Sequence, residues 1–159
     1  MDDDFTPLEQ NAWGGLLGMY GRLVRRIEAD LQEHSRISHV EFEVLLRLSW
    51  TEDHRLRIQD LAEQSVLTRS GVSRMVGRLE QAGLVVRESA TEDRRGAYAV
   101  LTETGLEHFR RALRAHIVFV RRNFLAFFSD EELAQMAEFW RRVEQQDSAS
   151  IPEAKTSTE

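Results

Sequence analysis

The chain has 159 residues, a formal net charge of −6 and no cysteine. This length suits one domain with its own hydrophobic core, and the absence of cysteine excludes disulfides, thiolate metal sites and thiol redox chemistry. No apolar run approaches the ~20 residues that span a bilayer, and the opening "MDDDFTPLEQ" is acidic where a secretory signal is basic. We therefore expect a cytoplasmic protein that makes no membrane contact.

The charge is unevenly distributed along the chain. From Arg55 to Leu101 there are eight arginines and six acidic residues, a local net of +2, and the remaining segments carry a net of −8. A locally basic segment between acidic flanks suggests an anionic partner for that segment. The alternative is scattered, solvated charge, and the positions of the arginines have to decide between the two.

The N-terminal part of the chain predicts a long amphipathic helix. Pro7 suits the first turn of a helix, where its missing N–H is not needed. An apolar stripe follows at helical spacing from Trp13 through Tyr20 to Leu31. A helix with one such continuous stripe needs a long partner, either in its own chain or in a second copy.

A second helix is predicted to start at the capping box Ser38–Glu41. Its apolar residues lie on two sides, and we therefore expect it to be central and buried on both. The segment "RIQDLAEQSV" then indicates a short third helix, and Thr68 is a suitable N-cap for a fourth. Gly83 is placed to end that fourth helix as its C′ glycine. Two short helices around a tight turn, the second amphipathic, predict a helix-turn-helix.

The fourth predicted helix, 68–82, carries the residues suited to DNA. Its core side consists of Val72, Met75, Val76 and Leu79. The opposite side is centred on Ser70, Arg74, Gly77 and Gln81, and it is flanked by Ser73 and Arg78. Arginine donates two hydrogen bonds to guanine, serine and glutamine meet several base edges, and a glycine permits close approach of the backbone. Arg69 and Arg78 lie nearer the rim and suit phosphates. The alternative is an ordinary polar surface helix.

The segments "GLVVRES" and "GAYAVLT" predict a two-stranded ribbon with a charged tip, "ATEDRRG". An arginine at such a tip can enter a minor groove, and Asp93 is best explained as a partner that orients it. Thr102 is a predicted N-cap for a further long helix, whose apolar stripe runs from Leu106 to Phe128. A second capping box, Ser129–Glu132, leads into the last helix. From Gln146 the tail has too little apolar content to fold, and we expect it to be disordered.

The run from Arg57 to Gly105 resembles the MarR family of winged-helix regulators. The matching residues are "DLAEQSVLTRSGVSRMVGRLEQAGLVVR" and "DRRGAYAVLTETG", which fits the wing pattern Asp-x-Arg, then Leu-Thr, then Gly. The resemblance implies a mainly α fold with a small β wing: a winged helix-turn-helix lobe at about 55–101 and dimerisation helices at about 7–33 and 103–145. It implies one domain over 1–145 and a homodimer that reads a palindromic operator in double-stranded DNA.

By the same resemblance Arg95 is the minor-groove arginine, Asp93 is its support, and Ser70, Ser73 and Arg74 form the contacting face of the recognition helix. The full set of expected DNA-binding residues is Arg69, Ser70, Ser73, Arg74, Gly77, Arg78, Arg87, Asp93, Arg94 and Arg95. The chain departs from the family at two positions. Gln59 stands where such proteins often have a capping Thr or Ser, and Arg69 stands where they often have Pro.

Many members of the family release DNA when a small, often aromatic and anionic, ligand binds between the dimer helices and the DNA-binding lobe. Candidate pocket residues here are Trp13, Tyr20, His39, Glu43, Trp50 and His116. Each has a second explanation: Trp13 and Tyr20 as core, His116 as a buried histidine with satisfied hydrogen bonds, and Glu43 as the ion-pair partner of Arg47.

The sequence offers no sign of a metal, a cofactor or catalysis. Its five histidines lack HExxH or short double-histidine spacing, and there is no Gly-x-Ser-x-Gly, phosphate-cradling glycine loop or acid–base pair. The leading hypothesis is a homodimeric regulator, a repressor relieved by a small ligand. The alternatives are a regulator without a ligand, a winged-helix protein–protein adaptor and, third, an enzyme. Retention of Arg74 and Arg95 with Asp93 favours DNA binding over the adaptor.

Overall fold

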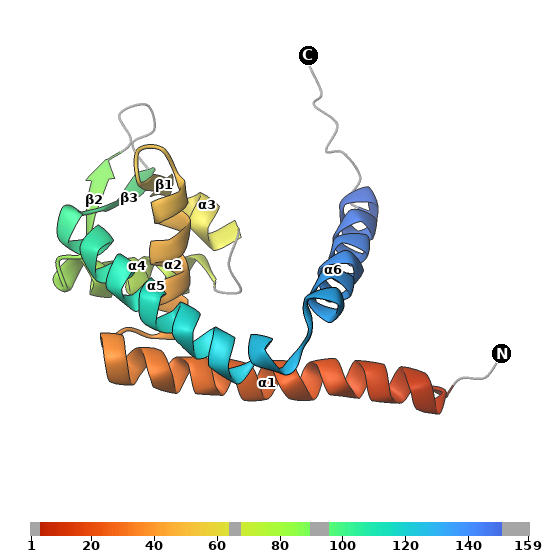
Figure 1. Cartoon of the computed structure of the whole chain (residues 1–159). Helices are drawn as coiled ribbons and strands as arrows, with labels where there is room; N and C mark the ends of the chain where they lie inside the picture. The colour runs from red at the N-terminus through yellow and green to blue at the C-terminus, as the bar shows by residue number, and fades with distance from the viewer. Residues whose placement is uncertain (1–3, 64–67, 90–95, 151–159) are drawn as a thin grey trace, which may run out of the picture. The chain divides into compact units, whose positions relative to one another are not determined.

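The computed structural model describes residues 4–63, 68–89 and 96–150, and of residues 146–150 it describes the backbone only (Figure 1). Its contacts divide the chain into two units, Met1–Phe119 and Val120–Glu159, and each is described by itself. In chain order the elements are α1 (Pro7–Ser35), α2 (His39–Trp50), β1 (Arg55–Arg57), α3 (Ile58–Glu63), α4 (Arg69–Gln81), β2 (Val85–Ser89), β3 (Ala97–Leu101), α5 (Glu103–Asn123), the 3-10 turn η1 (Leu125–Phe127) and α6 (Asp130–Ser150).

Helix α1 begins as the sequence predicts and is packed over only part of its length. Thr6 is its N-cap, forms a capping box with Glu9, and precedes Pro7 in the first turn. The buried residues of α1, Ile27, Leu31 and Ser35, all lie in its C-terminal third. The apolar stripe of the first turns, in contrast, stays exposed in a single chain.

Helix α2 forms the centre of the first unit, as predicted. Ser38 and Glu41 form the expected capping box at its start. Phe42, Leu45 and Leu48 are buried, and so is Val44 on the other side of the helix. Because α2 packs against α1, β1 and β3, it connects the long N-terminal helix to the rest of the lobe.

Helix α4 has the predicted caps. The Thr68 hydroxyl accepts a hydrogen bond from the Gly71 N–H. At the other end Gly83 has a φ of +71°, a left-handed conformation that glycine adopts without strain. The N–H groups of Gly83 and Leu84 donate to the carbonyls of Glu80 and Leu79, which is a Schellman motif. This stop directs the chain straight into β2.

The sheet has three strands in the order β1-β3-β2, and both pairs are antiparallel. The predicted ribbon corresponds to β2 and β3, but the sequence analysis missed β1, which pairs Arg57 with Tyr98. A strand of three residues is too short to show the alternation by which strands are recognised. The wing is therefore anchored to the lobe by a third strand.

The "LTETG" segment joins the wing to α5 and to the end of α4. The Thr102 hydroxyl donates to the carbonyl of Gly83 and accepts from the Gly105 N–H, at 2.8 and 2.9 Å. A Cβ at Gly105 would lie 1.9 Å from the carbonyl oxygen of Leu84. Glycine is therefore required there, because α5 crosses the chain just after α4 at backbone distance.

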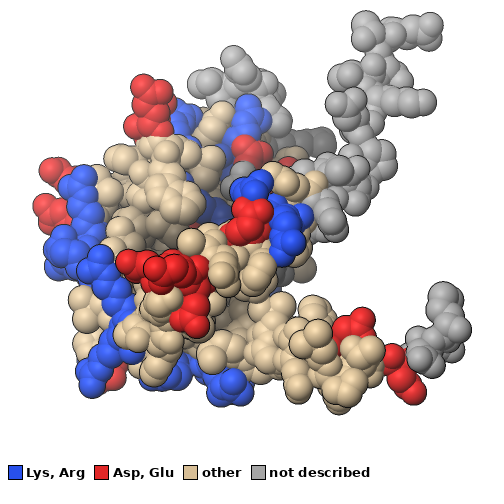
Figure 2. Space-filling model, turned by 45° about the vertical axis from the view of Figure 1, so that its right-hand side comes forward, with Lys and Arg blue, Asp and Glu red and all other residues tan. Residues whose placement is uncertain are grey.

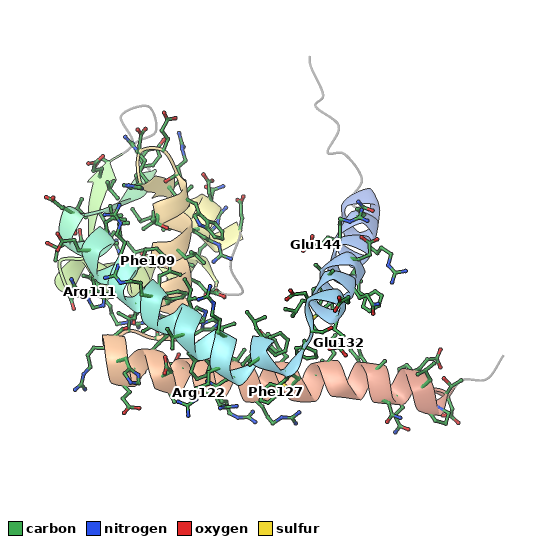
Figure 3. All side chains as sticks on the ribbon, in the orientation of Figure 1. Phe109, Arg111, Arg122, Phe127, Glu132 and Glu144 are labelled. Carbon is green, nitrogen blue, oxygen red and sulfur yellow. The ribbon has the colours of Figure 1, made fainter. Side chains whose placement is uncertain are left out.

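Helix α5 packs one face on the lobe. In Figure 3 Phe109 points from α5 toward α2, where it lies against Phe42 with ring centroids 5.5 Å apart, and Arg111 points away. The expected stripe from Leu106 to Phe128 does not lie on one helix, because α5 ends at Asn123 and η1 follows. Phe124 and Phe128 instead pack on each other across that turn, with centroids 5.2 Å apart.

Helix α6, in the second unit, begins at the predicted capping box, in which Ser129 N–H donates to the Glu132 carboxylate. Its backbone is helical to Ser150, and the disordered tail expected from Gln146 stays a prediction. Within the described ranges, no helix is long and apolar enough to cross a membrane.

Candidate nucleic-acid interface

Helix α4 presents one buried and one exposed side. Val72, Met75, Val76 and Leu79 are at most 2% exposed, which confirms the predicted core side. Ser70 and Arg74 are exposed on the other side, and Ser73 and Gly77 are partly covered. The apolar side holds α4 on the lobe, so its outer side is offered as a rigid surface to a partner.

The three arginines of α4 differ in their partners. Arg69 approaches Glu63 of α3 at 3.8 Å, and both side chains are largely exposed, so the pair holds Arg69 weakly. Arg78 is bound to Glu41 of α2 at 3.1 Å. Arg74 makes no ion pair with any residue that the structure describes. It is thus the α4 arginine most free to bind an external acceptor, as expected for a base-reading residue.

Glu41 is the acidic residue that pairs with Arg78. Burial by itself raises its pKa, but the hydrogen bonds from Ser38 and Arg78 outweigh burial and hold the pKa of Glu41 below its ordinary value. The carboxylate is therefore charged at neutral pH and engages Arg78, for which the sequence analysis expected a phosphate. The structure gives Arg78 an internal partner, and a DNA contact of Arg78 stays a prediction.

Arg87 of β2 lies across α4. Its guanidinium donates to the Ser73 carbonyl and pairs with Glu80 at 3.3 Å. A Cβ at Gly77 would lie 3.3 Å from the Arg87 guanidinium. Arg87 therefore lies beside Gly77, and the close approach of DNA to this glycine stays a prediction.

A hollow of about 490 Å³ opens between the start of α3, the outer side of α4 and the sheet. Three arginines line it, and none of the described residues that line it is acidic. The lining residues are Arg57, Ile58, Gln59, Arg69, Ser73, Arg87, Gly96 and Ala97. Gln59 does not cap α3 but donates to Glu63 one turn later, at 3.1 Å. A concave, basic surface next to α4 suits the phosphate backbone of DNA.

Strand β1 adds two cations that the sequence analysis did not select. Arg57 donates to the Tyr98 hydroxyl at 3.1 Å, and the Arg55 guanidinium lies over the Tyr98 ring, 4.0 Å from its centroid. Because three residues are too few to show a strand alternation, β1 is recognised only from its pairing with β3. The predicted wing-tip residues Asp93, Arg94 and Arg95 lie outside the described residues, and their roles stay predictions.

The candidate ligand residues separate into two groups. His39 of α2 approaches Glu43 at 3.5 Å, and His116 of α5 packs against Phe42 with ring centroids 4.8 Å apart and ring planes tilted by 44°. Burial and the neighbouring His39 lower the pKa of His116, and Asp30 opposes them. The Nδ1 atoms of both histidines are buried and lack a hydrogen-bond partner among the described residues. The satisfied buried histidine that we considered is therefore not what the structure shows.

The other three candidates, Trp13, Tyr20 and Trp50, are exposed. The alternative explanation of Trp13 and Tyr20 as core residues is wrong for a single chain. Arg47 also pairs with Glu43, at 3.7 Å, so the expected surface ion pair is present. Among the residues that the structure describes, no group of acidic or histidine side chains is arranged to hold a metal.

Comparison with known proteins agrees with this geometry. The MarR family model matches residues 37–96. AbsC, a MarR family transcriptional regulator from Streptomyces coelicolor, is 34% identical, with a TM-score of 0.82 over 92% of this chain and 99% of AbsC. Sco3205, from the same organism and solved in complex with DNA, is 30% identical, with a TM-score of 0.84 over 98% and 96%.

Among curated proteins, the repressor MdtR of Bacillus subtilis is 29% identical over 124 residues, which are 77% of this chain and 79% of MdtR. The proteins that share this fold and sequence are transcriptional regulators and not enzymes. Together with the helix-turn-helix, the three-stranded wing and the exposed outer side of α4, these similarities identify the chain as a member of the MarR family of transcriptional regulators.

Proposed function

We propose that this chain is a sequence-specific regulator that places α4 in the major groove of DNA. The observation that carries the proposal is Arg74, which is exposed on the outer side of α4 and has no ion-pair partner among the described residues. Ser70 and Ser73 lie on the same side. The basic hollow beside α4 receives the phosphate backbone, and Arg95 reaches the adjacent minor groove.

The active form is a homodimer. The first four turns of α1 expose large apolar side chains in a single chain, and Figure 2 shows this part of the helix as mainly uncharged surface. A patch of this kind marks an interaction surface, and a second copy of the same helix covers it with matching chemistry. Two copies carry two α4 helices, which read the two halves of a palindrome.

The regulator acts as a repressor in the cytoplasm, and a small aromatic or anionic molecule relieves its binding. Two observations support the ligand: the unpartnered Nδ1 atoms of His39 and His116, and the neighbouring Glu43–Arg47 pair, whose arginine suits an anion. The alternative is a regulator without a ligand, in which the two histidines only pack α2 on α5. A protein–protein adaptor would not need Arg74 exposed on α4 without an ion-pair partner among the described residues.

Selection of duplexes from a random-sequence library by the full chain tests the DNA-binding proposal. We expect enrichment of a palindrome with half-sites about one helical turn apart. Arg74→Ala should lower the affinity for that duplex by about 1–3 kcal/mol and change the preferred base at one position of each half-site. An equal loss on all sequences would make Arg74 a phosphate contact, and no enrichment would contradict the proposed function.

A thermal-shift screen with phenolic and other aromatic acids tests the ligand. A compound that raises the melting temperature should also weaken binding to the enriched duplex, because it favours the state that does not bind DNA. If no compound shifts the melting temperature or the DNA affinity, the regulator without a ligand is the better description.

A further inference from the structure

The first turn of α2 uses one carboxylate for two tasks. Oε2 of Glu41 accepts hydrogen bonds from the Ser38 N–H and hydroxyl at 2.8 and 3.0 Å, which closes the capping box. Its other oxygen, Oε1, accepts from Nε of Arg78 on α4 at 3.1 Å. The Glu41 side chain is only 14% exposed. A carboxylate fixed by its own helix is a rigid acceptor, so Arg78 is held at a defined position.

The same turn of α2 is also attached to α1. The N–H of His39, the first residue of α2, donates to Oε2 of Glu28 at 2.6 Å. Ile27 and Leu31 of α1 are buried on either side of Glu28, so this part of α1 is packed on the lobe. The first turn of α2 is therefore bound to α1 on one side and binds α4 on the other.

Arg78 lies one helical turn after Arg74 on α4. Both line a hollow of about 230 Å³ between α4 and the start of α2, together with Ser38, Val40, Gly71 and Met75. A restraint on Arg78 therefore restrains the rotation of α4 about its own axis, and with it the direction in which Arg74 points. A base-reading arginine needs such a fixed direction, because its two hydrogen bonds to guanine tolerate little misplacement.

We infer that Arg78 is a positioning residue and not a phosphate contact: through Glu41 it fixes α4 to the first turn of α2 and so aims Arg74 at the base edges. The inference rests on the proposed DNA-binding function. It predicts that removal of the negative charge of Glu41 weakens DNA binding. Removing a carboxylate beside a DNA-binding surface should by electrostatics alone tighten DNA binding, whereas loss of the positioning contact should weaken it.

The experiment compares Glu41→Gln, Arg78→Gln and the double variant of the full chain, with the duplex that wild type enriches from a random-sequence library as the probe. Glutamine at the third position of a helix preserves the capping box, so Glu41→Gln removes mainly the ion pair. The matched control is Glu132→Gln in the capping box of α6 (Figure 3), where the structure describes no arginine partner for the carboxylate.

We expect each single variant to bind the duplex about three- to fivefold more weakly, the range of a partly exposed ion pair. The double variant should bind no more weakly than either single one, because all three lack the same contact. The dependence of affinity on salt concentration should keep its slope, since no phosphate contact is lost. Glu132→Gln should bind as wild type does.

Each of the following results would overturn the inference. In the first, Glu41→Gln binds as well as wild type or better, and Arg78→Gln weakens binding with a salt slope reduced by about one, as for a phosphate contact. In the second, Glu132→Gln weakens binding as much as Glu41→Gln, so that helix capping is responsible. In the third, the losses of the two single variants add.

If Glu41→Gln does not fold, the salt slope of Arg78→Gln alone decides, because Arg78 is largely exposed and its removal leaves the core intact. If wild type enriches no duplex, the proposed function fails and the inference falls with it. That outcome is distinct from normal binding by wild type with unchanged variants, which overturns the inference alone.

Discussion

The lobe buries most of its apolar side chains, whereas the first turns of α1 leave theirs exposed. In the lobe Leu45, Leu48 and Val72 are completely buried, and these side chains come from different elements of the same chain. In α1 Trp13 and Tyr20 remain exposed, although they recur at the same helical spacing as a core stripe. The lobe thus completes its core within one chain, whereas the exposed side chains of α1 agree with the homodimer that we propose.

Two of the exposed tryptophans, Trp13 and Trp50, test this difference between the regions. Trp13 on α1 is 52% exposed and Trp50 at the end of α2 is 75% exposed, so exposure alone does not distinguish them. We expect Trp13→Ala to weaken the homodimer by about 4 kcal/mol, since each of two protomers loses a large anchor side chain. Sedimentation velocity over a range of protein concentrations measures this shift.

Trp50→Ala is the matched control, because it removes the same side chain from the lobe. It should leave the dimer dissociation constant unchanged. If both variants weaken the dimer equally, or neither does, the apolar stripe on α1 is not the dimer interface. The exposed side chains of α1 then have no role that distinguishes them from those of the lobe.

Two glycines test the same contrast in the single chain. Gly105→Ala should destabilise the fold by about 3 kcal/mol, because its Cβ would collide with the Leu84 carbonyl, a backbone atom that cannot move aside. A Cβ at Gly15 of α1 would meet no atom of another element within 4 Å, so Gly15→Ala should gain up to about 1 kcal/mol from helix propensity. Urea unfolding at one fixed protein concentration measures both.

A stable Gly105→Ala variant would mean that α5 approaches the lobe less closely than the structure shows. A destabilised Gly15→Ala variant would mean that the second copy packs against this side of α1, away from the apolar stripe. Either result would change which parts of the chain are expected to pack within one protomer and which on a second copy.

Local signals made most of the lobe predictable. Ser38, Thr68 and Ser129 are capping residues whose function depends on three or four neighbours in sequence, and each begins its helix as expected. Gly83 is equally local. The Leu-Thr-x-x-Gly pattern was taken from the family resemblance, and the structure adds its cause in the contacts of Thr102 and Gly105 with the end of α4.

The features that sequence reasoning missed depend on residues far apart in the chain. Strand β1 exists because β3 pairs with it about forty positions later, and the Glu41–Arg78 pair joins α2 to α4 across 37 positions. The place of Arg87 over Gly77 depends on the turn between α4 and β2. None of these pairings leaves a periodic signal, so a single sequence predicts the residue types of the site better than their partners.

Arg95 tests whether the wing contributes to DNA binding in addition to α4. We expect Arg95→Ala to weaken binding to the enriched duplex by about 2 kcal/mol, because a minor-groove arginine loses its contact, and to leave the dimer intact. The control is Arg141→Ala on α6, whose guanidinium pairs with Glu138, and which changes the net charge equally. Fluorescence anisotropy measures the affinities, and unchanged binding by Arg95→Ala would refute the wing assignment.

The smallest expected effect is a pH dependence of stability that arises where α5 meets α2. Burial and the nearby His39 lower the pKa of His116, against the opposing charge of Asp30, so between that lowered pKa and 6.5 the unfolded chain binds more protons than the folded one. Stability should therefore be full above about pH 6.5 and decrease as the pH falls below it. His116→Gln should flatten the urea midpoint between about pH 7.5 and pH 5.5, whereas the same replacement of the exposed His34 should not. An unaltered pH profile in His116→Gln would assign the proton uptake to another group and leave the α2–α5 contact insensitive to pH.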